Sequence, residues 1–150
     1  MTAKKTEPSY DTTREVRDTC LCLHVQRGAR ALARRFDDVF RALDLTHGQF
    51  SLLMSLNRPD PPTIGSVAAL IGMDRTSLTA KLKPLEQRNL LRVQTDADDR
   101  RTRRLALTDE GRALLARAVP LWRKTHAELE NALPKKRQAD IRAAMNALVY

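Results

Sequence analysis

The order of sequence patterns between residues 63 and 107 constrains the fold of this chain more than any other feature. A short apolar segment over 63–71 and a second one over 75–88 are separated by the turn Gly72-Met73-Asp74, and both segments have helical spacing of their apolar residues. Asp74 can cap the second helix at its start, and Asn89 tolerates the left-handed conformation that commonly ends a helix. Two helices joined by a tight turn are therefore predicted.

Two strand-like runs follow these helices directly. Residues 90–95 and 103–107 are rich in Leu, Val and Thr, and the polar loop 96–102 connects them. A helix, a turn, a second helix and a β-hairpin make up a winged helix-turn-helix. The predicted fold class is therefore mainly α with a small β-hairpin wing.

Amphipathic helices are predicted on both sides of this unit. One long helix is expected over about 14–43, a second after Thr46, one after Thr108 and a last one from about Pro134. They carry more apolar surface than a small winged unit can cover, which favours a homodimer. We therefore expect a flexible arm over 1–13 and a single domain over 14–150, in which 14–45 and 112–150 dimerise and 46–111 form the winged helix-turn-helix.

The charge of the chain favours an anionic partner. Its 150 residues include 27 Lys and Arg and 18 Asp and Glu, a net charge of +9. Aromatic residues make up only 4%, too few for the stacking surfaces that single-stranded nucleic acids need, so duplex DNA is the better candidate. No stretch is apolar enough for a membrane span or a secretory signal, which predicts a cytoplasmic protein. A protein that merely coats DNA without sequence preference is the alternative of a different class.

Nothing in the sequence indicates catalysis, a metal site or a cofactor. There is no glycine loop for phosphates and no nucleophile elbow, so no enzyme is expected. The three histidines are too far apart along the chain to suggest metal ligands.

The chain resembles the MarR family of transcriptional regulators from Thr13 onward. The similarity is carried by the segments 74–79, 85–90 and 96–101 and by Leu107-Thr108-Asp109-Glu110-Gly111-Arg112 after the wing. Asn89 replaces the usual Gly and Ala97 a frequent Pro, and both changes are mild. The resemblance implies a homodimer on a pseudo-palindromic DNA operator, more often a repressor than an activator.

Polar and basic side chains of the second short helix and the wing have the chemistry to contact bases and phosphates. An ordinary solvated surface is the alternative for each of them. The expected DNA-binding residues are Asp74, Arg75, Thr76, Ser77, Thr79, Lys81, Lys83, Asp99, Arg100, Arg101 and Arg103. By resemblance, the Asp99 carboxylate holds the Arg101 guanidinium so that it points at the minor groove.

Two kinds of signal are compatible with the sequence. The resemblance favours a small aromatic or acidic ligand that releases the repressor, with candidate contacts at His24, Arg27, His47 and Phe50. The alternative is a response to organic hydroperoxides through Cys22, which occupies the place of the reactive cysteine in one branch of the family. That branch surrounds its thiolate with tyrosine hydroxyls, whereas Gln26 and Phe36 stand at the equivalent positions here, so oxidation is not the favoured signal. Cys20 and Cys22 would point to opposite faces of one helix, which disfavours a bridge between them.

Overall fold

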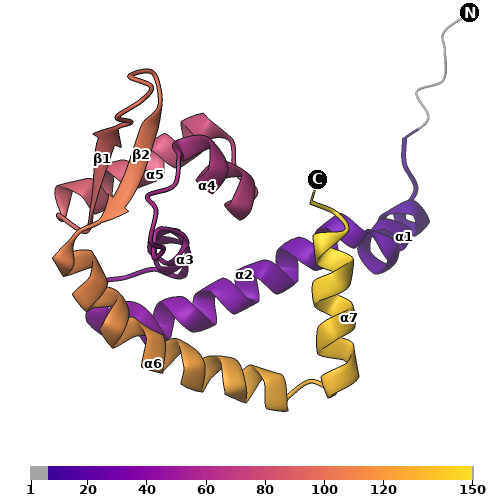
Figure 1. Ribbon diagram of the computed structural model, residues 1–150. Coiled ribbons are helices and arrows are strands. Elements are labelled where there is room, and N and C mark those ends of the chain that lie inside the picture. Colours follow the sequence, from indigo (N-terminus) through magenta and orange to yellow (C-terminus); the bar gives the residue numbers. More distant parts are fainter. Residues whose placement is uncertain (1–6, 150) are drawn as a thin grey trace, which may run out of the picture. The chain divides into compact units, whose positions relative to one another are not determined.

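The computed structural model describes residues 7–149, apart from the side chain of Lys136, and is mainly helical with one two-stranded antiparallel sheet (Figure 1). The predicted fold class is confirmed. The chain divides into two compact units, one that ends at Arg35 and one that begins at Phe36, and each is described by itself. In the described part of the chain, no helix is both long and apolar enough to cross a membrane.

The first unit contains helix α1 (Tyr10–Thr19) and most of helix α2 (Leu21–Phe40). The Ser9 side chain accepts a hydrogen bond from the backbone N of Thr12, which caps α1. The prediction of one uninterrupted helix over 14–43 is wrong, because Cys20 adopts extended backbone angles (φ −66°, ψ 105°) between the two helices. The expected arm is also shorter than predicted, since α1 already begins at Tyr10. Residues 1–6 of that arm lie outside the described residues.

The second unit contains the last turn of α2 and all the remaining elements. These are the 3₁₀ turn η1 (Arg41–Leu43), the helices α3 (His47–Ser55), α4 (Ile64–Ile71), α5 (Arg75–Gln87), α6 (Asp109–Asn131) and α7 (Lys135–Asn146), and the strands β1 (Leu91–Thr95) and β2 (Arg103–Leu107). Thr46, Thr63, Asp74 and Thr108 each cap the helix that follows them with a side-chain oxygen. These local signals explain why the predicted starts of α3 and α5 are accurate.

One core joins α3, α4, α5, the sheet and the first half of α6. Its largest fully buried side chains are Phe40, Leu53, Val67, Leu78, Leu85, Leu91 and Leu105. Each such side chain contributes about 1.5–3 kcal/mol by leaving water. Three of them come from α5 and β1, so the core holds the second short helix and the hairpin in one fixed arrangement (Figure 1).

The hairpin is also attached to the segment before α4. β1 and β2 pair from Leu91 opposite Leu107 to Thr95 opposite Arg103. On the other side of β2, Leu105 N donates to the Pro62 carbonyl at 2.9 Å, and Thr63 forms a bridge with Arg104. The proline-rich segment that sequence reasoning treats only as a breaker thus forms part of the base of the wing.

The start of α6 generates a stability prediction. A Cβ atom at Gly111 would lie 2.0 Å from the Leu90 carbonyl oxygen, so Gly111→Ala should lower the free energy of unfolding by about 2 kcal/mol or more through overpacking. Gly48 in α3 is the control, since a Cβ there meets nothing within 4 Å and Gly48→Ala should stabilise the helix by up to about 1 kcal/mol. Urea denaturation of both variants checks this, and equal stabilities would contradict the close approach.

Candidate nucleic-acid interface

Asp74 determines where α5 begins. Its carboxylate accepts a hydrogen bond from the Ser77 backbone N at 2.8 Å and a second one from the Ser77 hydroxyl at 2.6 Å. The Ser77 hydroxyl, together with the Ser77 backbone N–H, holds the pKa of Asp74 below its usual range. Asp74 is therefore engaged in capping α5, a role separate from its predicted contact with DNA.

The three hydroxyl groups at the start of α5 differ in their surroundings. Ser77 donates to Asp74, and Thr79 Oγ1 donates to the Arg75 carbonyl at 2.8 Å. Thr76 is exposed, and its hydroxyl has no hydrogen-bond partner among the described residues. Of these side chains, Thr76 can therefore donate to a base edge without losing a bond inside the protein.

Arg75 and two arginines of the wing border the same hollow. It has a volume of about 330 Å³ and lies between α5, the start of α4 and the wing. The Arg75 guanidinium lies directly over Gly65, where a Cβ atom would come within 2.8 Å of it. None of the described lining residues is acidic; they are Thr63, Ile64, Gly65, Arg75, Thr79, Arg101, Thr102 and Arg103. Three cations around one uncompensated hollow suit an anion such as a phosphate group.

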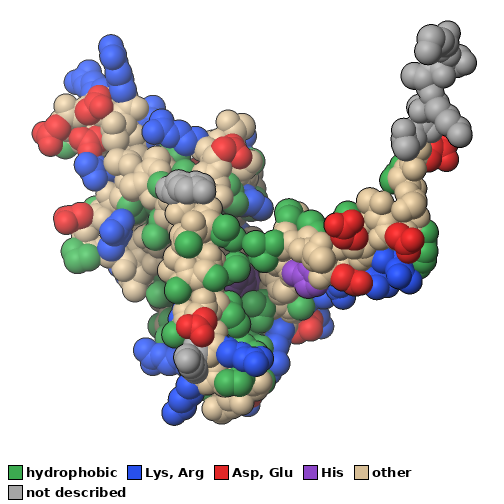
Figure 2. Space-filling model, turned by 90° about the vertical axis from the view of Figure 1, so that its right-hand side faces the viewer, with side chains coloured by type: hydrophobic (Ala, Val, Ile, Leu, Met, Phe, Trp, Pro, Cys, Tyr) green, Lys and Arg blue, Asp and Glu red, His purple; other side chains and the backbone are tan. Residues whose placement is uncertain are grey.

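The wing contains an ion pair with a buried carboxylate, which sequence reasoning missed. Asp96, only 9% exposed, forms an ion pair with Arg104, and its Oδ1 accepts hydrogen bonds from the backbone N of Asp98 at 2.8 Å and of Asp99 at 3.0 Å. The Arg104 guanidinium has the largest effect in lowering the pKa of Asp96, and the two backbone N–H groups lower this pKa further. Basic and acidic side chains lie side by side at the wing end of the molecule (Figure 2).

The predicted pairing of Asp99 with the Arg101 guanidinium is wrong in this structure. Asp99 instead accepts hydrogen bonds from the Arg101 backbone N at 2.9 Å and from the Thr102 hydroxyl at 2.8 Å. Closing this turn engages both carboxylate oxygens, and no ion pair joins the two side chains within residues 7–149. Arg100 and Arg101 are exposed, whereas Arg103 donates to the Thr95 hydroxyl across the hairpin.

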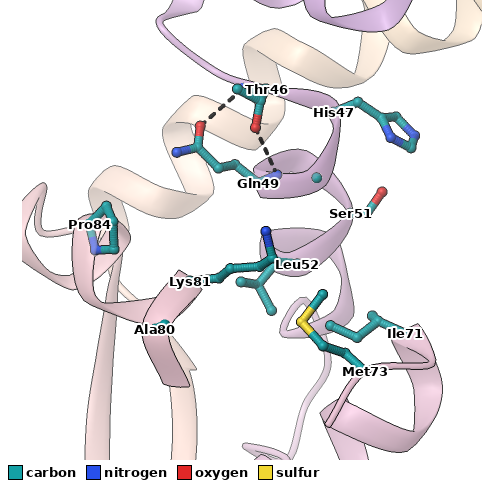
Figure 3. A pocket seen from close by; sticks show the side chains of 11 residues that line it. Thr46, His47, Gln49, Ser51, Leu52, Ile71, Met73, Ala80, Lys81 and Pro84 are labelled. Carbon is teal, nitrogen blue, oxygen red and sulfur yellow. Dashed lines mark hydrogen bonds between the residues drawn. The ribbon is translucent and has the colours of Figure 1, made fainter. Parts of the chain in front are cut away.

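The two lysines of α5 lie in different surroundings. Lys83 is exposed and lines none of the described cavities, whereas Lys81 lines a separate cavity of about 560 Å³. Figure 3 shows Lys81 and Met73 facing this space between α3 and α5. Its walls are Thr46, His47, Gly48, Gln49, Ser51, Leu52, Ile71, Met73, Ala80, Lys81 and Pro84. A largely apolar space with one cation at its wall suits a small organic anion.

The four predicted ligand contacts are found in three places. His47 lines the cavity beside α5, whereas Phe50 is a core residue, 5% exposed, whose ring lies 4.8 Å from that of Phe40. Phe50 therefore packs in the core, and its role in ligand binding stays a prediction. His24 and Arg27 line a hollow along α2 in the first unit, and their role in ligand binding stays a prediction.

The two cysteines are free, and Cys22 is exposed. The Gln26 side-chain amide donates to Cys22 Sγ at 3.2 Å, so the residue that replaces an expected tyrosine also supplies a donor. The two cysteines do not share one helix as predicted, because Cys20 is not helical.

Comparison with known proteins assigns the family. The model of the MarR family matches residues 45–102. The transcriptional regulator MosR of M. tuberculosis, in complex with DNA, is 37% identical with a TM-score of 0.77, over 86% of this chain and 96% of that chain. The transcriptional repressor CouR bound to a 23-mer DNA duplex is 27% identical with a TM-score of 0.77, over 97% and 100%. A variant of E. coli MarR with operator DNA, 20% identical over 90% and 97%, shares the fold with a TM-score of 0.79. The chain therefore belongs to the MarR family of transcriptional regulators.

The cap of α5 predicts how stability depends on pH. Because the pKa of Asp74 is lowered in the folded chain, its ionised form stabilises the fold at neutral pH, and this contribution disappears as the pH falls below about 3.9. Asp74→Asn keeps a capping oxygen but not the charge, so the difference in the free energy of unfolding between parent and variant should shrink as the pH falls below about 3.9.

Urea denaturation at several pH values measures this difference. Asp60→Asn, which changes an exposed carboxylate in the loop before α4, serves as the control for the loss of one negative charge. A difference for Asp74→Asn that stays constant with pH would contradict the assignment.

Proposed function

We propose that this chain is a sequence-specific regulator that binds double-stranded DNA as a homodimer, with α5 in the major groove and the wing arginines on the backbone or in the minor groove. The observation that carries the proposal is the hollow where Arg75 of α5 meets Arg101 and Arg103 of the wing. A DNA phosphate is the anion that a helix in one groove and a wing beside it would reach together. The DNA complexes of MosR and CouR support this assignment.

Exposed apolar side chains support the homodimer. Val16, Leu21 and Leu32 on α1 and α2, and Ile141 and Leu148 on or next to α7, are 47–60% exposed in the single chain. Contact with a second copy would remove them from water, and two-fold symmetry would place two copies of α5 about 34 Å apart for successive major grooves. Residues 14–45 and 112–150 are thus proposed to dimerise, and the operator is proposed to be pseudo-palindromic.

We propose that the regulator is a repressor and that a small aromatic acid releases it by binding beside α5. The cavity of about 560 Å³ is of ordinary size for such ligands, and Ala80, Lys81 and Pro84 of α5 form one of its walls. Pro84 has no N–H to donate to the Ala80 carbonyl one turn earlier, which leaves that acceptor for a ligand hydroxyl. A tenfold release needs only about 1.4 kcal/mol of differential binding between the two states of the dimer.

A response to oxidation through Cys22 is the second candidate. The exposure of Cys22 and the amide donor of Gln26 at 3.2 Å favour it, because a donor stabilises a thiolate. It differs from the ligand proposal in being independent of the cavity beside α5.

The DNA proposal is tested with an operator duplex and a random duplex of equal length. Thr76→Ala should lower the preference for the operator by about tenfold, since it removes a base contact without changing charge. Arg101→Ala should weaken binding to both duplexes and reduce the slope of log K against log salt by about 0.9 for each phosphate that the variant no longer neutralises.

Arg117→Ala, which removes an exposed arginine on α6, is the charge-matched control and should leave the preference and the slope nearly unchanged. Equal affinity of the parent chain for both duplexes would identify a coating protein instead.

The signal is tested by titrating aromatic carboxylates and an organic hydroperoxide against the DNA complex. Lys81→Met should raise the acid concentration needed for half release by about tenfold, because it removes the cation from the cavity wall. Lys83→Met is the matched control, since Lys83 lies on the same helix outside the cavity. Cys22→Ser should respond to the acids like the parent chain. Release of the parent but not of Cys22→Ser by hydroperoxide, with no response to any acid, would favour oxidation.

A further inference from the structure

The ion pair of Asp96 and Arg104 joins a buried carboxylate to a partly exposed guanidinium. We propose that these two residues are positioning residues, which attach the wing to the segment before α4 and thereby aim Arg100 and Arg101 at DNA. Neither side chain needs to touch DNA for this role. The inference rests on the proposed function, because it concerns the geometry of the same interface.

Asp96 organises the loop that carries the exposed arginines. One carboxylate oxygen accepts hydrogen bonds from the backbone N of Asp98 and Asp99, and the other accepts from Arg104 Nε. The backbone N of Asp96 also donates to the Thr102 carbonyl at 2.9 Å, which closes the loop from its other side. The side chain is only 8% exposed, so water replaces these bonds poorly. The path of residues 97–101 therefore depends on the Asp96 carboxylate at the start of the loop and on the Asp99 carboxylate, which closes its turn.

Arg104 connects that carboxylate to a distant part of the chain. Its Nη1 donates to the Pro61 carbonyl at 2.8 Å, and its backbone forms the bridge with Thr63. Helix α4 begins at Ile64, one residue after this bridge, and carries the Gly65 over which Arg75 lies. The wing and the recognition helix α5 therefore both contact the same short segment, residues 61–65. These contacts hold the wing arginines and Arg75 around one hollow.

The side chains at these positions have few substitutes. An asparagine at position 96 has a single acceptor oxygen, so it can serve the two loop N–H groups or Arg104, but not both. A lysine at position 104 keeps the charge but cannot donate to Asp96 and to the Pro61 carbonyl through a planar fork. Both changes leave every exposed arginine of the wing in place.

The first test compares Asp96→Asn with Asp98→Asn in binding to the operator duplex. Both variants lose one negative charge in the same loop, and the Asp98 side chain is exposed. Electrostatics alone would strengthen the binding of both equally. We expect Asp96→Asn to bind about tenfold more weakly than Asp98→Asn. Its salt slope should also fall by about 0.9 for each phosphate that the misplaced arginines no longer reach, although no cation was removed.

The second test separates positioning from general stability. In an Arg101→Ala background, Asp96→Asn should cost less affinity than in the parent chain, since one of the two side chains that it aims is absent. Arg104→Lys should behave like Asp96→Asn, with Arg92→Lys on the exposed side of β1 as its control. Arg104→Lys also provides the test should Asp96→Asn fail to fold. Additive losses in the double variant would overturn the proposal.

Hydrogen exchange distinguishes a failure of this inference from a failure of the proposed function. The backbone amides of Asp98 and Asp99 should exchange faster in Asp96→Asn and Arg104→Lys than in the parent chain, whether or not DNA binds. Unchanged exchange, or equal operator affinity of Asp96→Asn and Asp98→Asn, overturns the positioning role. A parent chain with no preference for the operator overturns the proposed function, while the exchange result still decides whether the pair holds the wing.

Discussion

Burial of Leu78, Leu82 and Leu85 sets the rotation of α5 about its axis, and every candidate DNA contact on that helix depends on this rotation. The three leucines occupy one stripe of the helix, with 0–3% exposure. Because a helix has 3.6 residues per turn, this arrangement places Arg75, Thr76 and Thr79 outside the core. Since Leu91 and Leu105 are buried in the same core, the orientation of the helix and the position of the hairpin are coupled.

Carboxylates in this region act on the backbone and on neighbouring side chains. Asp74 begins α5, Asp96 organises the wing loop and Asp99 closes its turn. These groups lie within a chain of net charge +9, so they offset some of its attraction for DNA. They also help to fix the positions of the neighbouring cationic side chains. An arginine that is held in place loses less conformational entropy on binding than one on a free loop. Acidic residues in a basic interface are thus compatible with tight and selective binding.

The local part of this structure could be predicted from the sequence, whereas contacts between distant residues could not. Helical spacing and capping residues give α3, α4 and α5 nearly at their observed limits, and Asn89 adopts the predicted left-handed conformation with φ 54°. The hydrogen bond between Arg104 and Pro61 joins residues that are 43 positions apart, and no periodic pattern in the sequence predicts it. Residue type alone also does not define what a side chain contacts. A carboxylate such as that of Asp99 accepts hydrogen bonds from nearby donors, and in a tight turn these include backbone N–H groups. An aromatic residue such as Phe50 suits packing and ligand binding equally well, and only the structure shows that its ring packs against Phe40.

In the proposed mechanism, the cavity beside α5 connects ligand binding to DNA binding without a long pathway. Ala80 and Lys81 lie in its wall one turn from Thr76, and the intervening Leu78 is fully buried. A packed core does not compress, so a ligand that enlarges this cavity has to displace α5 or α3 as a whole. Displacement of α5 moves Arg75 and Thr76 with it, because both belong to the same rigid helix. The proposed coupling between the two sites would therefore follow from the stiffness of one short helix, and its size would be set by how much better the ligand fits the displaced arrangement.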